Sequence, residues 1–534
     1  MSAAPGVGAL DPLTSPAALA FWRGALARGR GGADGPGAAR RWLARAGRAR
    51  GGAACAWGGV RLARFLAWRS AMLARFPGPR PSLLHGNLCE LQRAGGLTAA
   101  FLEQVHASGG GRVCGFWPGP ASLAVSVEDP ALQLEVLSQC GSRPGVELGL
   151  ERHDELLGRA GESEQVRLQY ARVLGSAQQL AKLHFATREA LEPLSRAWGE
   201  REGGAVDVAA ELAPALYDAV GTVLLNLPWG DHPKSGRILE LSRRVARGSA
   251  HWAVRQRVPP VWDERYQRFL LDVAEWRRAC GDLLDMRRAD VTHNPEKYAQ
   301  DESALTLLAA EVGDDGRPLF SKRDAVSAMC GLLRGAHETT HAAAVWLLYH
   351  LASNQGSQYL LSAELDALAP AGKMPSAHDL RGCERLEATL LESMRLRATV
   401  PIVSRVNLDH DIELGGLAVP KGTQVVLPLY RAFTQVDVFG VQADKFIPER
   451  FMGPHPMAHN ARRALAAFGA DSRQCPGAHF ARAQLKCIVA AVLSKFSVHL
   501  VTPGAQRIGD GVLEAGVNHP DLHLTLRLVK RRLP

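Results

Sequence analysis

The residues best suited to metal chemistry lie in one short stretch near the C-terminal end, Phe468 to Gly477, which reads FGADSRQCPG. Its single cysteine, Cys475, precedes a Pro-Gly pair and a largely apolar run from Ala478 to Phe496, so the pattern predicts a loop that leads into a long helix. A helix N-terminus favours the deprotonated form of a nearby thiol, and the thiolate is the form that binds metals. Cys475 is therefore our candidate metal ligand, and a structural or free thiol is the alternative.

Three neighbours of Cys475 suit a flat cofactor with acidic groups on its rim. Phe468 can cover the sulfur side of such a cofactor, and Arg473 can bind a carboxylate on its edge. Gly477 allows the backbone to approach closely because it has no side chain.

A second candidate centre is the sequence GAHETTH at residues 335–341, inside a predicted helix from Ser327 to Leu351. His337-Glu338-x-x-His341 matches the pattern of zinc proteases, in which two histidines on one helical face bind the metal and the glutamate activates water. In the alternative reading, Glu338 and Thr339 face the chemistry and both histidines lie on another face of the helix.

Two further motifs follow. Glu392 and Arg395 are three residues apart on a predicted helix over 384–396, so they can pair on one helical face. The segment FIPERF at 446–451 supplies a second arginine, Arg450, and a strand predicted over 400–406 carries Arg405.

Taken in this order, the motifs resemble those of the cytochrome P-450 family, and the resemblance covers about residues 77–534. The family's haem-binding loop reads Phe-x-x-Gly-x-Arg-x-Cys-x-Gly, and Asp471 replaces its inner glycine here. Because Asp tolerates left-handed backbone angles less well than Gly, we expect a strained or differently turned loop. Ala398 and Thr399 stand where the family usually has two prolines.

The resemblance implies a mainly α fold with small β-sheets, and haem b (iron protoporphyrin IX) between the long helix of Thr339 and the loop and helix of Cys475. It implies that Cys475 is the axial iron ligand and that Glu338 and Thr339 deliver protons for catalysis. It also gives cofactor-binding roles to Phe468, Arg473, Gly477 and Arg405, and it implies that a buried triad braces the loop below the haem, formed by Glu392, Arg395 and Arg450.

The implied reaction is a monooxygenation, in which one oxygen atom from O2 enters an apolar organic substrate by hydroxylation or epoxidation. No Gly-x-Gly-x-x-Gly fingerprint of a flavin or nicotinamide site was found, so we expect a separate electron donor, either a flavoprotein reductase or a ferredoxin. Two other functions stay open: a zinc metallopeptidase acting through His337, Glu338 and His341, and a haem-binding protein without turnover.

The net charge of +10 has a local origin. Residues 1–80 contain thirteen arginines, no lysine and two acidic residues, so the rest of the chain is close to neutral. A nearly neutral domain has no overall positive electrostatic potential to attract the phosphate backbone of a nucleic acid, which argues against nucleic acid as a partner. The nine cysteines form no Cys-x-x-Cys pair and do not suggest a disulfide framework.

Three segments are expected along the chain. Residues 1–51 form a basic leader rich in Ala, Gly and Arg, which is either a targeting segment or an unstructured extension. Residues 52–81 contain an amphipathic segment and a proline-rich hinge, and residues 82–534 form the catalytic domain. The apolar run in residues 52–76 is interrupted by arginines, so we expect a membrane-surface helix rather than a span, and an organellar or membrane-associated protein. A soluble cytoplasmic enzyme is the alternative.

Overall fold

The computed structural model describes residues 59–140, 164–201, 203–255, 263–310, 319–370, 372–407, 409–453, 455, 458–471, 474–501, 512–514, 517–519 and 524–531. The chain divides into two compact units, residues 1–74 and residues 75–534. In the first unit, the described residues 59–74 are helical. The predicted leader over 1–51 and the start of the amphipathic segment lie outside the described residues, and the predicted domain boundaries remain predictions.

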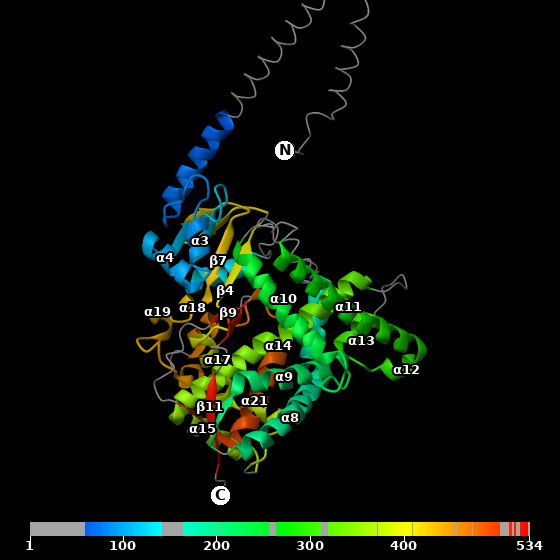
Figure 1. Ribbon diagram of the computed structural model, residues 1–534. Helices are drawn as coiled ribbons and strands as arrows, with labels where there is room; N and C mark the ends of the chain where they lie inside the picture. Colours follow the sequence, from blue (N-terminus) through cyan, green and yellow to red (C-terminus); the bar gives the residue numbers. More distant parts are fainter. Residues whose placement is uncertain are drawn as a thin grey trace, which may run out of the picture. The chain divides into compact units, whose positions relative to one another are not determined.

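Helices dominate the second unit (Figure 1). The helices of the first half of the chain are α3 (Leu88–Arg93), α4 (Ala99–Gly109), α5 (Pro130–Gln139), α7 (Glu164–Gly175), α8 (Ala177–Glu200), α9 (Val208–Leu225) and α10 (Ser235–Arg255). Those of the second half are α11 (Glu264–His293), α12 (Pro295–Tyr298), α13 (Ala304–Ala310), α14 (Lys322–Ser353), α15 (Gln355–Leu368), α16 (Ala377–Gly382), α17 (Glu384–Leu396), α18 (Leu429–Ala432), α19 (Val436–Phe439), the 3₁₀ helix η2 (Pro448–Phe451), α20 (Ala458–Ala464) and α21 (Ala478–Leu493).

The strands form four small sheets. The largest has the order β1-β2-β7-β4, and a three-stranded sheet has the order β3-β11-β8. Two hairpins, β5-β6 and β9-β10, complete the set. The strands are β1 (Val113–Phe116), β2 (Ala124–Val127), β3 (Ala205–Asp207), β4 (Ile402–Val406), β5 (Ile412–Leu414), β6 (Leu417–Val419), β7 (Gln424–Pro428), β8 (Phe496–Leu500), β9 (Val512–Glu514), β10 (Val517–His519) and β11 (Thr525–Lys530). The prediction of a mainly α fold with small β-sheets is confirmed.

Helix α14 lies at the centre of the helical part and packs against α9, α11, α17 and α21. Ser321 caps its N-terminus by accepting a hydrogen bond from the backbone N–H of Asp324. Its C-terminal half joins one large apolar cluster with α17 and α21, and its N-terminal half joins a second cluster with α9 and α11. A helix that is apolar on several faces is buried between neighbours, which fixes its position in the fold.

Helix α9 is long and apolar enough to cross a membrane by length and composition, and it is the one helix among the described residues with this property. Most of that helix is buried inside the second unit, where it packs against α8 and α14. The same composition is typical of a helix in a protein core.

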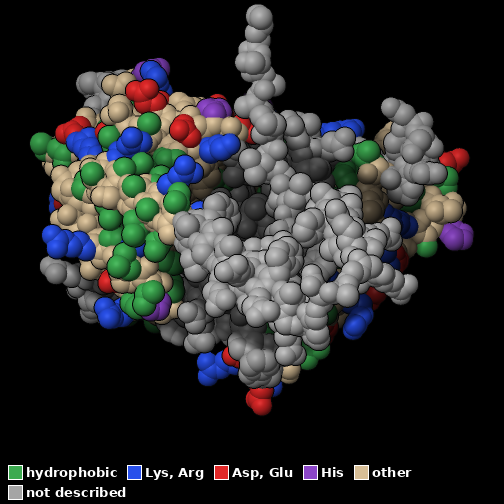
Figure 2. Space-filling model, turned by 90° about the horizontal axis from the view of Figure 1, so that it is seen from above, with side chains coloured by type: hydrophobic (Ala, Val, Ile, Leu, Met, Phe, Trp, Pro, Cys, Tyr) green, Lys and Arg blue, Asp and Glu red, His purple; other side chains and the backbone are tan. Residues whose placement is uncertain are grey.

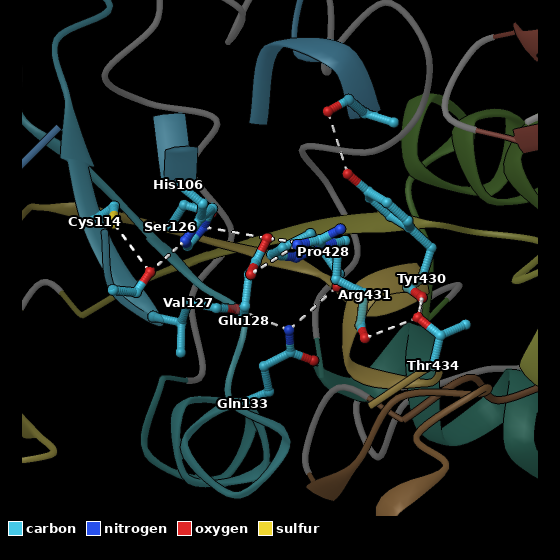
Figure 3. Close-up of polar contacts among 12 residues, drawn as sticks. His106, Cys114, Ser126, Val127, Glu128, Gln133, Pro428, Tyr430, Arg431 and Thr434 are labelled. Atoms are coloured by element: carbon cyan, nitrogen blue, oxygen red, sulfur yellow. Dashed lines mark hydrogen bonds and ion pairs between the residues drawn. The ribbon is translucent and has the colours of Figure 1, made fainter. Parts of the chain in front are cut away.

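A buried polar network ties the N-terminal part of the second unit to a segment some 300 residues later (Figure 3). On α4, the Nε2 atom of His106 lies 2.9 Å from Ser126 Oγ, and its Nδ1 atom contacts a backbone carbonyl. The carboxylate of Glu128 accepts a hydrogen bond from Arg431 Nε at 2.9 Å. Glu128 is almost fully buried but the Arg431 side chain is 40% exposed, so this ion pair is partly shielded from solvent, and it joins the residue after β2 to α18.

Candidate active site

The Cys475 loop is closed by its own backbone. The N–H of Cys475 donates to the carbonyl of Phe468 at 2.7 Å, and the N–H of Ala478 donates to the carbonyl of Cys475 at 3.3 Å. Helix α21 starts directly after Gly477, as predicted, and the Cys475 side chain is exposed. The thiol therefore lies at a helix N-terminus, where unpaired backbone N–H groups favour a negative charge.

Asp471 adopts a left-handed backbone conformation with a φ of 52°. Its carbonyl accepts a hydrogen bond from the N–H of Gln474 at 3.0 Å, which closes the turn before the cysteine. Asp is one of the few residues other than glycine that occupies this region as a single residue. Asp471 therefore takes the left-handed conformation itself, with the strain that a side chain carries there.

Phe468 and Gly477 flank the cysteine as expected from the sequence. The Phe468 ring packs against the main apolar cluster, and the Arg482 guanidinium lies 5.0 Å from its centre. A side chain at Gly477 would approach a Leu174 methyl group at 3.5 Å and the Cys475 sulfur at 3.8 Å, so glycine leaves space beside the sulfur. Arg473 lies outside the described residues, and its cofactor contact remains a prediction.

Glu392, Arg395 and Arg450 come together in the core. Arg395 donates twice to the Glu392 carboxylate, at 2.7 and 2.9 Å, and both side chains are fully buried. The Nε atom of Arg450 lies 3.5 Å from the same carboxylate. Burial lowers the pKa of Arg450, and the charge of Glu392 opposes that shift.

The two arginines also bind the backbone of the segment that precedes the cysteine loop. Arg395 donates to the carbonyls of Phe433, Ala443 and Lys445, and Arg450 donates to those of Phe439 and Gln442. Charged donors make stronger hydrogen bonds than neutral ones. The three residues therefore hold the backbone of residues 433–445 in place.

Arg405 lies on β4, and only 5% of its surface is exposed. Its NH1 group donates to the carbonyl of Ser404 at 2.9 Å. Its charge reaches Cys140, whose pKa is raised by burial and lowered in part by Arg405. Nearby in sequence, Thr399 Oγ1 and Arg397 Nε are buried atoms without a hydrogen-bond partner, and the Arg397 guanidinium lies over the Trp346 ring at 5.3 Å.

Glu338 and Thr339 lie on the middle of α14. The Thr339 hydroxyl donates to the carbonyl of Gly335 at 2.7 Å, and Arg334 Nε donates to the Glu338 carboxylate at 3.1 Å. Gly335 is exposed, and a side chain there would meet nothing within 4 Å. An open space therefore lies against α14 one turn before Thr339.

The contact from Arg334 was not predicted. Both residues of the pair are largely buried, with side-chain exposures of 9% for Arg334 and 18% for Glu338. The signal was present in the sequence, because residues four apart on a helix lie on one face.

The two histidines of the zinc-type pattern point to α9. His337 Nε2 lies 2.8 Å from the carbonyl of Ala213, and His341 Nε2 lies 2.7 Å from that of Ala209. A carbonyl only accepts hydrogen bonds, so each Nε2 atom carries a hydrogen and is not a metal ligand. Among the residues that the structure describes, no group of three His, Cys, Asp or Glu side chains could hold a metal ion. The geometry favours the alternative in which the histidines lie on another face.

The family can now be assigned. The sequence model of the family described as Cytochrome P450 matches residues 76–514. The chain belongs to the cytochrome P450 family. The resemblance inferred from the motifs is therefore confirmed.

Similar proteins include several other members of the cytochrome P450 family. The mouse mitochondrial 1,25-dihydroxyvitamin D(3) 24-hydroxylase is 32% identical over 212 residues, which are 39% of this chain and 39% of that protein. A putative cytochrome P450 138 from Mycobacterium bovis is 27% identical over 235 residues (44% and 49%), and the cytochrome P450 714C3 of Oryza sativa subsp. japonica is 28% identical over 209 residues (39% and 41%). The chain thus spans less than half the length of these relatives.

Membership in the cytochrome P450 family implies a haem-iron cofactor, and the residues present fit such a group. An exposed thiol stands at a helix N-terminus, an open surface lies along α14 at Gly335, and α14 packs directly against the helix that follows the thiol. This donor set, with one soft sulfur ligand and cationic side chains, suits an iron porphyrin that carries carboxylates.

Proposed function

We propose that this cytochrome P450 is a haem-thiolate monooxygenase that inserts one oxygen atom from O2 into an apolar organic substrate. The observation that carries the proposal is the exposed Cys475 thiol, in a closed loop at the start of α21, in a chain of this family. Haem b is the proposed cofactor, and when bound it supplies the activation of dioxygen once electrons have arrived.

In this proposal Cys475 would hold the haem iron through its sulfur, and four residues would contribute to the rest of the cofactor site. Phe468 covers the sulfur side, Gly477 leaves space beside the sulfur, and Arg405 and Arg473 bind the acidic rim. The triad of Glu392, Arg395 and Arg450 keeps the segment before the loop in place.

Glu338 and Thr339 are the proposed proton-delivery residues. The Thr339 hydroxyl gives its own hydrogen to the carbonyl of Gly335, so the lone pairs of its oxygen can accept a hydrogen bond from a protonated group in the open space beside α14. Glu338 is adjacent and largely buried, and a carboxylate can take protons from water and pass them on.

The proposal also includes a substrate class and an electron donor. Apolar side chains dominate α14 before Gly335, which favours an apolar small molecule. A separate flavoprotein reductase or ferredoxin is the proposed donor.

We also propose that the protein associates with a membrane surface, in an organelle or elsewhere in the cell. On the described helix of residues 59–74, Leu62, Leu66 and Leu73 are exposed and share one face by their spacing, and no acidic residue occurs in that helix. In the second unit, Leu83 and Leu84 are 69% and 78% exposed. Figure 2 shows hydrophobic side chains gathered on one face of the molecule with Lys and Arg side chains among them. The name of the mouse relative places that protein in mitochondria.

The first test is an absorption spectrum of the purified, haem-loaded protein after reduction and addition of carbon monoxide. We expect the red-shifted Soret band of a thiolate-ligated haem, and we expect its loss in Cys475→Ala. The matched control is Cys487→Ala, since Cys487 lies on α21 but is buried in the core. A wild-type spectrum without that band, or a band that persists in Cys475→Ala, contradicts the proposal.

The second test addresses turnover and location. Dioxygen-dependent oxidation of apolar compounds is measured with a flavoprotein reductase in one series and a ferredoxin with its reductase in another. Failure of every combination, in protein with a normal spectrum, favours a haem protein without turnover.

A fluorescent reporter fused to residues 1–80 tests location, and a diffuse signal argues against the membrane or organelle.

A further inference from the structure

The pair His337 and His341 has no role in the proposed reaction, yet both side chains make specific contacts. Each Nε2 atom donates to a carbonyl of α9, at 2.8 Å for Ala213 and 2.7 Å for Ala209. The two rings stack with their centres 6.0 Å apart and their planes 18° apart. Two hydrogen bonds one helical turn apart thus join α14 to α9.

The carbonyls that accept these bonds belong to Ala213 and Ala209 on α9. A carbonyl oxygen has two lone pairs, so each can accept from a histidine as well as from a helical N–H. Pro214 removes the helical donor of the Ala210 carbonyl, which receives neither histidine bond. Tyr217, also on α9, packs edge-on against His337 at 5.1 Å, which limits the rotation of the imidazole ring.

These contacts lie next to the proposed proton-delivery residues. Glu338 and Thr339 directly follow His337, and successive residues of an α-helix are related by a rotation of about 100° around the helix axis. A helix held at two points on its α9 side can neither rotate nor slide, so the directions of the next two side chains are fixed. A hydrogen bond from Thr339 to Gly335 controls only the hydroxyl and does not fix the helix itself.

We propose that His337 and His341 are positioning residues, which hold α14 against α9 so that Glu338 and Thr339 face the bound cofactor at the correct angle. This inference rests on the proposed function, because it concerns the same site. It assigns the histidines of the zinc-type pattern to hydrogen-bond donors rather than to metal ligands.

The test uses the full-length, haem-loaded protein, reduced and bound to carbon monoxide, whose infrared stretching band reports on polar groups near the distal side of the haem. Four variants are compared: His337→Leu and His341→Leu, which remove the donor, and His337→Gln and His341→Gln, whose side-chain amide can place an N–H at nearly the same point. We expect the band to shift or broaden in the Leu variants and to return toward the wild-type position in the Gln variants.

A matched control is His350, which is buried on the same helix but bonds to Ser393 Oγ at 2.9 Å on the side of α17. His350→Leu should lower thermal stability and leave the infrared band unchanged. Hydrogen exchange at the amides of residues 335–341 gives a second measurement. Exchange should be faster in His337→Leu and His341→Leu and unchanged in His350→Leu and the Gln variants.

The outcomes separate the two levels of the proposal. A wild-type protein without a thiolate-type spectrum contradicts the proposed function. A normal spectrum with an unchanged infrared band and unchanged exchange in both Leu variants overturns the positioning role alone. A band that shifts equally in the Leu and Gln variants also overturns it, because the donated hydrogen bond would then not be the cause.

Discussion

Arg334 lies one turn before Glu338 on α14, and its Nε atom donates to the Glu338 carboxylate at 3.1 Å. This bond fixes the acidic side chain that directly precedes Thr339. Both side chains are mostly shielded from solvent, so the attraction between them is less weakened by water than at a surface. The arginine thus selects one direction for the carboxylate.

Replacement of this arginine should uncouple the carboxylate from its position. We expect Arg334→Gln to lower dioxygen-dependent turnover several-fold while the carbon monoxide spectrum stays normal, because the haem ligand is not affected. Dioxygen consumption driven by a ferredoxin and its reductase, measured in H2O and D2O, checks this. Lys322→Gln is the control on the same helix, because its ion pair with Asp285 is exposed. Equal turnover of Arg334→Gln and wild type would exclude the role.

The triad should contribute strongly to stability. Glu392→Gln leaves two buried arginines without their countercharge, and the loss of one partner from a buried ion pair costs about 3–5 kcal/mol. Thermal unfolding and haem retention are the measurements. Glu449→Gln is the control, since Glu449 pairs with Arg385 at 2.6 Å but is 43% exposed, and such a pair contributes at most about 1 kcal/mol. Similar effects of the two substitutions would contradict the prediction.

The left-handed turn at Asp471 should be relieved by glycine. A non-glycine residue in this region carries a steric cost of about 1–2 kcal/mol, which glycine removes. Glycine also loses more backbone entropy on folding, and this loss cancels part of the stabilisation. We therefore expect Asp471→Gly to stabilise the protein by up to about 1 kcal/mol, with the spectrum retained. Ala470→Gly, at a neighbouring position without a positive φ, should destabilise it slightly. Denaturant unfolding distinguishes the two, and a destabilised Asp471→Gly would show that the aspartate side chain makes a contact of its own.

His350 should make the protein sensitive to acid. Burial, together with the charges of Arg397 and Arg395, lowers its pKa from 6.5 to about 3. The unfolded chain binds this proton at a higher pH than the folded protein, so the stability associated with His350 is present above pH 6.5 and falls as the pH decreases toward 3. Between pH 7.5 and pH 5 the loss amounts to about 2 kcal/mol.

His350→Phe tests this dependence, because the ring can still stack on Phe446, which lies 5.0 Å away. The variant loses the hydrogen bond to Ser393 and should be less stable at pH 7.5, but the difference from wild type should shrink by about 2 kcal/mol at pH 5. A constant difference across this range would mean that folding does not shift the pKa of His350.

Local sequence patterns predicted the features that depend on neighbouring residues, such as helix starts and ion pairs within one helix. The spacing of Glu392 and Arg395 predicted their ion pair, and the Pro-Gly pair after Cys475 predicted the start of α21. The helix expected to continue to Phe496 ends at Leu493, because Phe496 begins β8 and pairs with β11. Strand pairing between distant residues overrides the apolar pattern there.

Tertiary contacts explain what the sequence did not reveal. The face of α14 that carries His337 could not be assigned, because the pattern fits a zinc site and a helix contact equally well. The carbonyls of Ala209 and Ala213, some 130 residues earlier, decide between them. At Asp471 the sequence left two outcomes open, strain or a different turn, and the structure shows a non-glycine residue in the left-handed region, where strain is expected.

The sheet β3-β11-β8 joins a strand at residues 205–207 to one at 525–530. During synthesis on the ribosome, β3 therefore emerges more than 300 residues before the strand beside which it lies, and it waits in an unpaired state. Pairings between residues so far apart in sequence form slowly. The three-stranded sheet therefore closes only after residues 525–530 have been synthesised.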